Sequence, residues 1–226
     1  MKIPPSHVID LLHTAAHGAL ASHSLHLPGY PFATLLPFVP DAQHRPLFLI
    51  SRLAEHTRNL AADPRASLLV AEPDATDVLS SARLTVVGEV QPVGADAIMT
   101  ERYLRYYPEA ADYLALGDFA FYRLEPLAWR LIAGFGRMGW IEDNELGQAE
   151  VLVAEQEAVE LSALASRFPD ARWLGLDAYG ADLEYRGQRQ RLSFPAPAAN
   201  AEARQQAVAE ALVTGLDAHA AQGPRE

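Results

Sequence analysis

The sequence predicts a mainly β chain in which a β-barrel with helical insertions is followed by a small α+β domain. Three observations support this fold class. Short strand-like segments follow one another closely in the first 133 residues, and the helices after the first fall in the connections between them. The composition becomes acidic and loop-like after Trp140, in the stretch IEDNELGQAE. The remaining residues show helical periodicity at both ends and three short strand patterns between them.

The elements of the first half follow from apolar spacing and from turn residues. The pattern predicts, in chain order, a helix over 5–22, strands over 31–38 and 46–51, a short helix over 53–62, strands over 66–71 and 83–90, a tyrosine-rich helical stretch over 95–116 interrupted by Pro108, and strands over 119–124 and 126–133. The wholly apolar centre of PLFLIS is typical of a strand covered on both faces. Gly88 is expected to bend its strand through a β-bulge.

The second half begins after a linker at about residues 142–148. We expect a helix over 149–168, strands over 173–178, 182–186 and 190–194, and a helix over 201–218 that Asn200 caps. The chain therefore divides into a barrel domain, residues 1–142, and a small C-terminal α+β domain, residues 149–226.

Charge and composition exclude several classes of partner. The net charge is −11, from 18 basic and 29 acidic residues, and no long basic run occurs, so nucleic acid and anionic membrane surfaces are not expected to bind. Because the chain has no cysteine, disulfides, zinc–thiolate sites, iron–sulfur clusters and thiolate-bound haem are excluded. No signal-peptide pattern or run of about 20 apolar residues occurs, so we expect a cytoplasmic protein.

The stretch LFLISRLAEHTRNLAADPRASLLV resembles the FMN-binding split-barrel superfamily that includes the pyridoxamine 5'-phosphate oxidases. In that superfamily a strand ends in serine, a short helix crosses, and a strand returns after an Asn/Asp-Pro-basic turn, here Asp63-Pro64-Arg65. The resemblance extends through ARLTVVGEV and RLIAGFGRMGWI and covers about residues 5–142. It implies a split β-barrel that forms homodimers and binds its ligands between subunits.

Within the superfamily, the two-domain layout resembles the HugZ-type haem-utilisation proteins. Those proteins are similar in carrying S-x-L-A-x-H-x-x-N, which is present here as Ser51, Leu53, Ala54, His56 and Asn59. The strand pair and closing helix of the second domain are also similar to theirs. The chain departs from many of these relatives in AEQEAVELSALA, a helix that lacks their histidines.

The segment from Ser51 to Asn59 is a candidate anion-binding site. A hydroxyl at Ser51, basic side chains at Arg52, His56 and Arg58, and the backbone N–H groups of a helix start would suit a phosphate or a haem propionate. The alternative is that Ser51 only caps the helix and Arg58 is solvated. A histidine stands near the place where the flavin-binding oxidases carry a fixed cation, which weakens a flavin phosphate site.

The segment GFGRMG, residues 134–139, matches G-x-G-x-x-G after a strand. A dinucleotide site would need a helix from the third glycine, and WIEDNELG is not helical in character. By resemblance to the HugZ-type proteins, Arg137 is a candidate haem-pocket residue; alternatively it pairs with Glu142 or Asp143. The same resemblance makes His219, near the C-terminus, a candidate haem iron ligand. His13 and His17 have metal-like spacing on the expected first helix, but no third ligand is evident.

Three functional hypotheses follow from the residues and the resemblance. The first is a haem-binding protein of haem and iron utilisation, with oxygen-dependent haem degradation as its activity if it turns over. The second is an FMN-dependent oxidoreductase that uses the same anion site for the flavin phosphate. The third is a non-catalytic module that binds haem for sensing or regulation.

Overall fold

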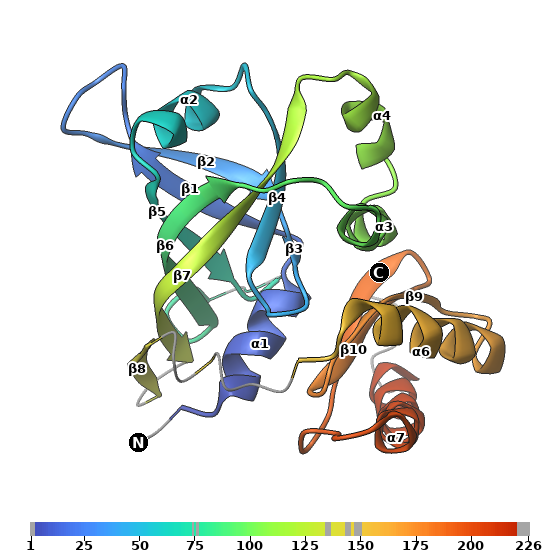
Figure 1. Ribbon diagram of the computed structural model, residues 1–226. Helices are drawn as coiled ribbons and strands as arrows, with labels where there is room; N and C mark the ends of the chain where they lie inside the picture. The colour runs from blue at the N-terminus through green and yellow to red at the C-terminus, as the bar shows by residue number, and fades with distance from the viewer. Residues whose placement is uncertain are drawn as a thin grey trace. The chain divides into compact units, whose positions relative to one another are not determined.

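An antiparallel sheet of eight strands curls into a half-barrel in the first of two units of the computed structural model (Figure 1). The two units are residues Met1–Ala149 and Glu150–Glu226. The structure describes residues 3–73, 75, 77–133, 137–142, 146 and 151–220, with side chains described as far as residue 213. None of the described helices is long and apolar enough to cross a membrane.

The strands of the first unit are hydrogen-bonded in the order β2-β1-β5-β6-β7-β4-β3, and β8 pairs with β7. In chain order the elements are α1 (Pro5–Thr14), β1 (His17–His23), β2 (Pro31–Pro37), β3 (Val39–Pro40), β4 (Pro46–Ser51), α2 (Glu55–Ala62), β5 (Arg65–Ala71), β6 (Ala82–Pro92), α3 (Ala97–Tyr106), α4 (Ala110–Ala115), β7 (Phe119–Ala133) and β8 (Met138–Glu142). The predicted class, a split barrel with helical insertions, is confirmed.

The core of this unit follows from strand alternation. Along β6, Leu84, Val86 and Val90 are buried, as the period of two requires. The β6–β7 register shifts between Val87 and Gly88, which confirms the predicted irregularity. A Cβ atom at Gly88 would lie 2.0 Å from the carbonyl oxygen of Glu125, so glycine lets the two strands approach closely here.

The predicted helix over residues 5–22 is wrong in its second half. Helix α1 ends at Thr14, and His17 begins strand β1. Pairing of β1 with both β2 and β5 overrides the helix propensity of the alanines. A Cβ atom at Gly18 would lie 2.8 Å from the Leu68 side chain, which shows how closely β1 packs on its neighbour. His13 and His17 therefore do not share a helix face.

The two predicted strands over 119–124 and 126–133 form one long strand, β7. Pro126 does not break it, because the register shift places the residue at a bulge, where a missing backbone N–H is tolerated. The tyrosine-rich stretch is helical and divides at Pro108 into α3 and α4, as predicted. Asp96 caps α3 by accepting a hydrogen bond from the backbone N–H of Met99.

The described part of the second unit, residues 151–220, has a three-stranded antiparallel sheet and two helices. Its elements are α6 (Ala154–Arg167), β9 (Arg172–Leu176), β10 (Gly180–Tyr185), β11 (Gln188–Ser193) and α7 (Ala201–Ala220). Its apolar core includes Leu164, Trp173 and Val208. Asn200 caps α7 by accepting a hydrogen bond from the backbone N–H of Ala203, which confirms the predicted cap.

Candidate functional site

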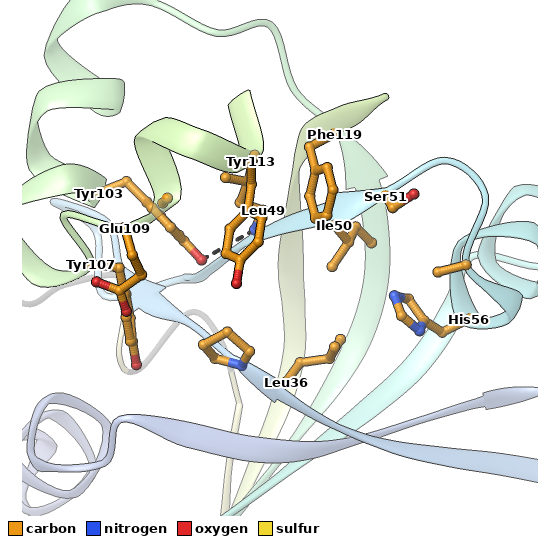
Figure 2. A pocket seen from close by; sticks show the side chains of 13 residues that line it. Leu36, Leu49, Ile50, Ser51, His56, Tyr103, Tyr107, Glu109, Tyr113 and Phe119 are labelled. Carbon is orange, nitrogen blue, oxygen red and sulfur yellow. Dashed lines mark hydrogen bonds between the residues drawn. The ribbon is translucent and has the colours of Figure 1, made fainter. Parts of the chain in front are cut away.

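A cavity of about 460 Å³ lies over β4 in the first unit (Figure 2). Its volume falls within the range of small-molecule sites. The lining side chains come from β2, β4, the start of α2, helices α3 and α4 with the turn between them, and the first residue of β7. They are Leu36, Pro37, Leu49, Ile50, Ser51, Ala54, His56, Tyr103, Tyr107, Glu109, Ala110, Tyr113 and Phe119.

Strand β4 forms the floor of the cavity, and the helical insertion α3–α4 supplies an aromatic wall. The Tyr113 and Phe119 rings are stacked, with centroids 5.1 Å apart and an angle of 23° between their planes. Tyr103 packs edge-on against Phe121 at 5.3 Å, which fixes its ring. The result is a predominantly apolar cavity whose aromatic walls suit a flat, largely apolar ligand.

His56 is the only imidazole in the described lining of the cavity. Its Nε2 atom is buried and has no hydrogen-bond partner among the residues that the structure describes. Burial lowers the pKa of His56 below its usual value because it disfavours the charged imidazolium. The lining of the cavity therefore contains a neutral imidazole whose buried Nε2 has no hydrogen-bond partner among the described residues (Figure 2).

The Tyr103 hydroxyl is a second polar group in the cavity wall. The Tyr103 side chain is 1% exposed, and its hydroxyl oxygen accepts a hydrogen bond from the backbone N–H of Leu49 at 3.3 Å. Burial, with a smaller contribution from the Glu109 charge, raises the pKa of this hydroxyl. It therefore stays protonated at neutral pH, when its hydrogen can still be donated to a ligand.

Ser51 lines the cavity but its hydroxyl is already used. It donates a 2.5 Å hydrogen bond to the Asp118 carboxylate and accepts the backbone N–H of Leu53 at 3.1 Å. The neighbouring Arg52 guanidinium donates to the carbonyl oxygen of Gly117 at 2.7 Å. Together these bonds fasten the β4–α2 turn to the residues that precede β7.

The other predicted anion-site residues do not line this cavity. Arg58 is exposed two positions beyond His56 on α2, and residues two apart on a helix do not face each other. Asn59 is buried, and its Oδ1 accepts the backbone N–H of Leu25 at 3.0 Å, so it holds the β1–β2 hairpin against α2. The structure thus brings Ser51 and His56 together at the cavity and leaves Arg52, Arg58 and Asn59 outside its lining.

The structure describes Arg137 with its side chain, but describes only the backbone at His219. Arg137 is exposed just before β8 and does not line the cavity. The strand that follows it, β8, confirms that no helix begins at the third glycine of GFGRMG. His219 falls within α7, but its side chain lies outside the described residues.

The charge of the cavity differs from that expected of an anion site. None of its described lining residues is lysine or arginine, His56 is neutral, and Glu109 contributes a carboxylate. From the sequence, the tyrosines were predicted only to belong to a helical stretch. The clustering of Tyr103, Tyr107 and Tyr113 within eleven residues, the first two four positions apart, was the signal available for an aromatic wall.

Comparison with known proteins identifies the family to which this fold belongs. The family model described as "CREG, beta-barrel" matches residues 6–148. The chain therefore belongs to the CREG β-barrel family, which confirms the split-barrel resemblance drawn from the sequence.

Two curated relatives and one solved structure extend this result. The chain is 30% identical over 164 residues to "Non-canonical heme oxygenase HOZ, chloroplastic" of Arabidopsis thaliana, covering 72% of this chain and 48% of that protein. It is 31% identical over 129 residues to "Heme oxygenase HutZ" of Vibrio cholerae, covering 52% and 70% respectively. A "heme binding protein from Mycobacterium smegmatis" aligns with a TM-score of 0.61 and 26% identity over 96% of this chain and 99% of that one. The chain thus spans about half the length of the plant relative.

Proposed function

We propose that the protein binds haem in haem and iron utilisation, and that oxygen-dependent haem degradation is the activity to test for. The observation that carries this proposal is the buried, unpartnered Nε2 of His56 in an apolar, aromatic-walled cavity. Support comes from relatives whose names record haem oxygenase or haem-binding proteins.

The residues of the cavity fit a haem group. The stacked Tyr113 and Phe119 and the apolar floor of β4 would hold the flat ring, and His56 and Tyr103 would offer it a neutral nitrogen and a hydroxyl donor. Bound haem would supply the oxygen chemistry, while the protein would supply orientation and electrostatics. His219 as iron ligand and Arg137 as a residue beside the haem stay predictions from the sequence.

The FMN-dependent oxidoreductase is the weaker of the enzymatic alternatives. A flavin phosphate carries about two negative charges and is usually met by fixed cations or free N–H groups. The described lining of this cavity has neither lysine nor arginine, and the Ser51 hydroxyl already donates to Asp118. The haem-sensing module differs from the first hypothesis only in turnover.

Absorbance titrations with haemin and with FMN test the proposal. We expect a saturable Soret change at one haem per chain and no saturable change with FMN. Saturable binding of FMN alone would replace haem binding with the flavin hypothesis. Haem loss under oxygen with ascorbate as reductant would support degradation, whereas stable bound haem would favour the non-catalytic module.

We also propose that the protein is a homodimer in the cytoplasm, and that the outer face of the sheet is the dimer interface. Leu35, Leu69 and Trp140 lie in one cross-strand row with Ala19, Thr85 and Arg130. Residues directly opposite one another in a ladder share a face of the sheet. The three large side chains are 65%, 45% and 61% exposed, and an exposed apolar row of this kind is typical of an interaction surface.

Sedimentation equilibrium of the wild type and of Leu69→Lys tests this interface. We expect a dimeric wild type and a folded, monomeric variant. Val213→Lys is the control, because Val213 is also an exposed apolar residue but lies on α7 of the second unit. A wild type that is monomeric, or a Leu69→Lys variant that stays dimeric, would contradict the proposed interface.

A further inference from the structure

The described lining of the cavity over β4 contains no lysine or arginine and one carboxylate, that of Glu109. The same lining offers three uncharged polar groups for which the described residues provide no partner: the Nε2 of His56, the hydroxyl hydrogen of Tyr103 and the hydroxyl of Tyr113. None of the three carries a charge that could neutralise a carboxylate or a phosphate. Burying an anion without a cation or several hydrogen-bond donors carries a large desolvation cost.

Two carboxylates add repulsion to this desolvation cost. Glu109 lines the cavity at the turn between α3 and α4, and its charge contributes to the raised pKa of the Tyr103 hydroxyl. Asp118 accepts the Ser51 hydroxyl hydrogen at the opposite end of the lining, where a ligand anion would otherwise meet a free donor. A ligand anion inside the cavity would therefore lie close to like charge and find no cation in the described lining.

We infer that the cavity receives the uncharged edge of a planar, carboxylate-bearing ligand and excludes its acidic end, with Glu109 as the specificity-determining residue. This inference rests on the proposed haem binding and adds the direction in which the ring enters. The carboxylates of the ligand stay outside the cavity, and the aromatic wall of Tyr113 and Phe119 contacts the apolar edge of the ring. The sequence predicted that propionates lie around Ser51 and His56; with this direction of entry, they lie outside the cavity instead.

The test compares haemin with haemin dimethyl ester, in which both carboxylates are masked. Each is titrated into the full-length protein in the same detergent solution, and binding is followed by absorbance and by quenching of tryptophan fluorescence. We expect the dissociation constant of the ester to be no more than threefold larger than that of haemin. If haemin binds and the ester binds tenfold more weakly or not at all, the carboxylates are recognised and the inference is overturned.

The variant Glu109→Lys tests the assigned residue. We expect it to raise the affinity for haemin at least threefold over that for the ester, because a cation at the cavity then accepts the acidic end. Glu101→Lys is the matched control, since Glu101 is on α3, is 70% exposed and does not line the cavity. An unchanged ratio of the two affinities in Glu109→Lys would overturn the role of Glu109.

The outcomes separate this inference from the proposed function. Failure of both haemin and the ester to bind the wild type would overturn haem binding itself, and the inference with it. Binding of haemin with rejection of the ester would leave haem binding in place and overturn only the direction of entry.

Discussion

The Ser51 hydroxyl and the Asp118 carboxylate are joined by a 2.5 Å hydrogen bond that connects the end of β4 to the residue before β7. The same two segments are joined by the backbone N–H of Arg52, which donates to the carbonyl oxygen of Asp118 at 2.9 Å. Ser51, which the sequence predicted to bind an anion, therefore has a structural role at the edge of the cavity.

Replacing Ser51 by alanine should destabilise this connection. Hydrogen bonds to charged groups contribute about 1.5–3 kcal/mol, so we expect the variant to lose about 1–2 kcal/mol of unfolding free energy, because Asp118 is partly solvated. Urea denaturation measures the change. Ser80→Ala is the control, since Ser80 is exposed and its hydrogen bonds reach only the nearby Asp77 in the same turn. Equal stability of the two variants would show that the connection is unimportant.

The pH dependence of stability should report the neutral state of His56. Burial lowers its pKa in the folded protein, so below about pH 6.5 the unfolded chain takes up a proton that the folded chain does not. Stability is therefore lost as pH falls from about 6.5 toward the lowered pKa. We expect the melting temperature of His56→Gln to fall less than that of the wild type between pH 7.5 and pH 5.

The control for this measurement is His7→Gln. His7 is exposed on α1, so its removal should leave the pH dependence of the melting temperature as in the wild type. If His56→Gln and the wild type lose stability in parallel, burial does not lower the pKa of His56 in the folded protein.

Gly88→Ala should be strongly destabilising. The added Cβ atom would lie 2.0 Å from the carbonyl oxygen of Glu125, a backbone atom that can move only if β6 and β7 separate. We expect a loss of about 3 kcal/mol or more, at the upper end of the cost of overpacking. Gly94→Ala, where no atom lies within 4 Å of the added Cβ, should change stability by less than about 1 kcal/mol. Similar stability of the two variants by thermal denaturation would contradict the β6–β7 register.

The buried ion pair between Arg204 and Glu160 in the second unit should contribute far more than a surface pair. Arg204 donates to both carboxylate oxygens of Glu160, and each side chain is 5% exposed. Glu160→Ala leaves a buried guanidinium without its partner, and we expect a loss of about 3–5 kcal/mol. Glu184→Ala, which breaks the half-exposed pair with Arg172, should cost less than about 1 kcal/mol. Denaturant unfolding followed by tryptophan fluorescence, to which Trp173 of the second unit contributes, compares the two variants.

Much of the fold could be predicted because local signals and tertiary packing agree. Strand β4 occupies 46–51 as expected, and the two helices α3 and α4 divide at Pro108. The sequence pattern failed where pairing outweighs propensity: Ala19 and Ala21 favour a helix but lie in a strand between β2 and β5. Gly18, disfavoured inside a helix, was the local sign of that error.

The candidate site was less predictable because it depends on which side chains point the same way. Ser51 and His56 are five residues apart and share the cavity, whereas Arg58 and Asn59 on the same helix face elsewhere. The commitment of the Ser51 hydroxyl to Asp118 joins residues 67 positions apart, a contact that no local pattern encodes. The aromatic wall likewise becomes visible only once α3 and α4 are folded over β4 (Figures 1 and 2).

The most direct test of the central claim, haem binding in the cavity over β4, is a haemin titration of the wild type beside a variant whose cavity is filled. Ala54 lines the cavity and has an extended backbone before α2 that accepts a larger side chain, so Ala54→Phe should fill the space and leave the fold intact by circular dichroism. We predict saturable binding of one haem per chain to the wild type and at least tenfold weaker binding to Ala54→Phe. Equal affinity of the two proteins for haemin would contradict the claim and place any haem site elsewhere.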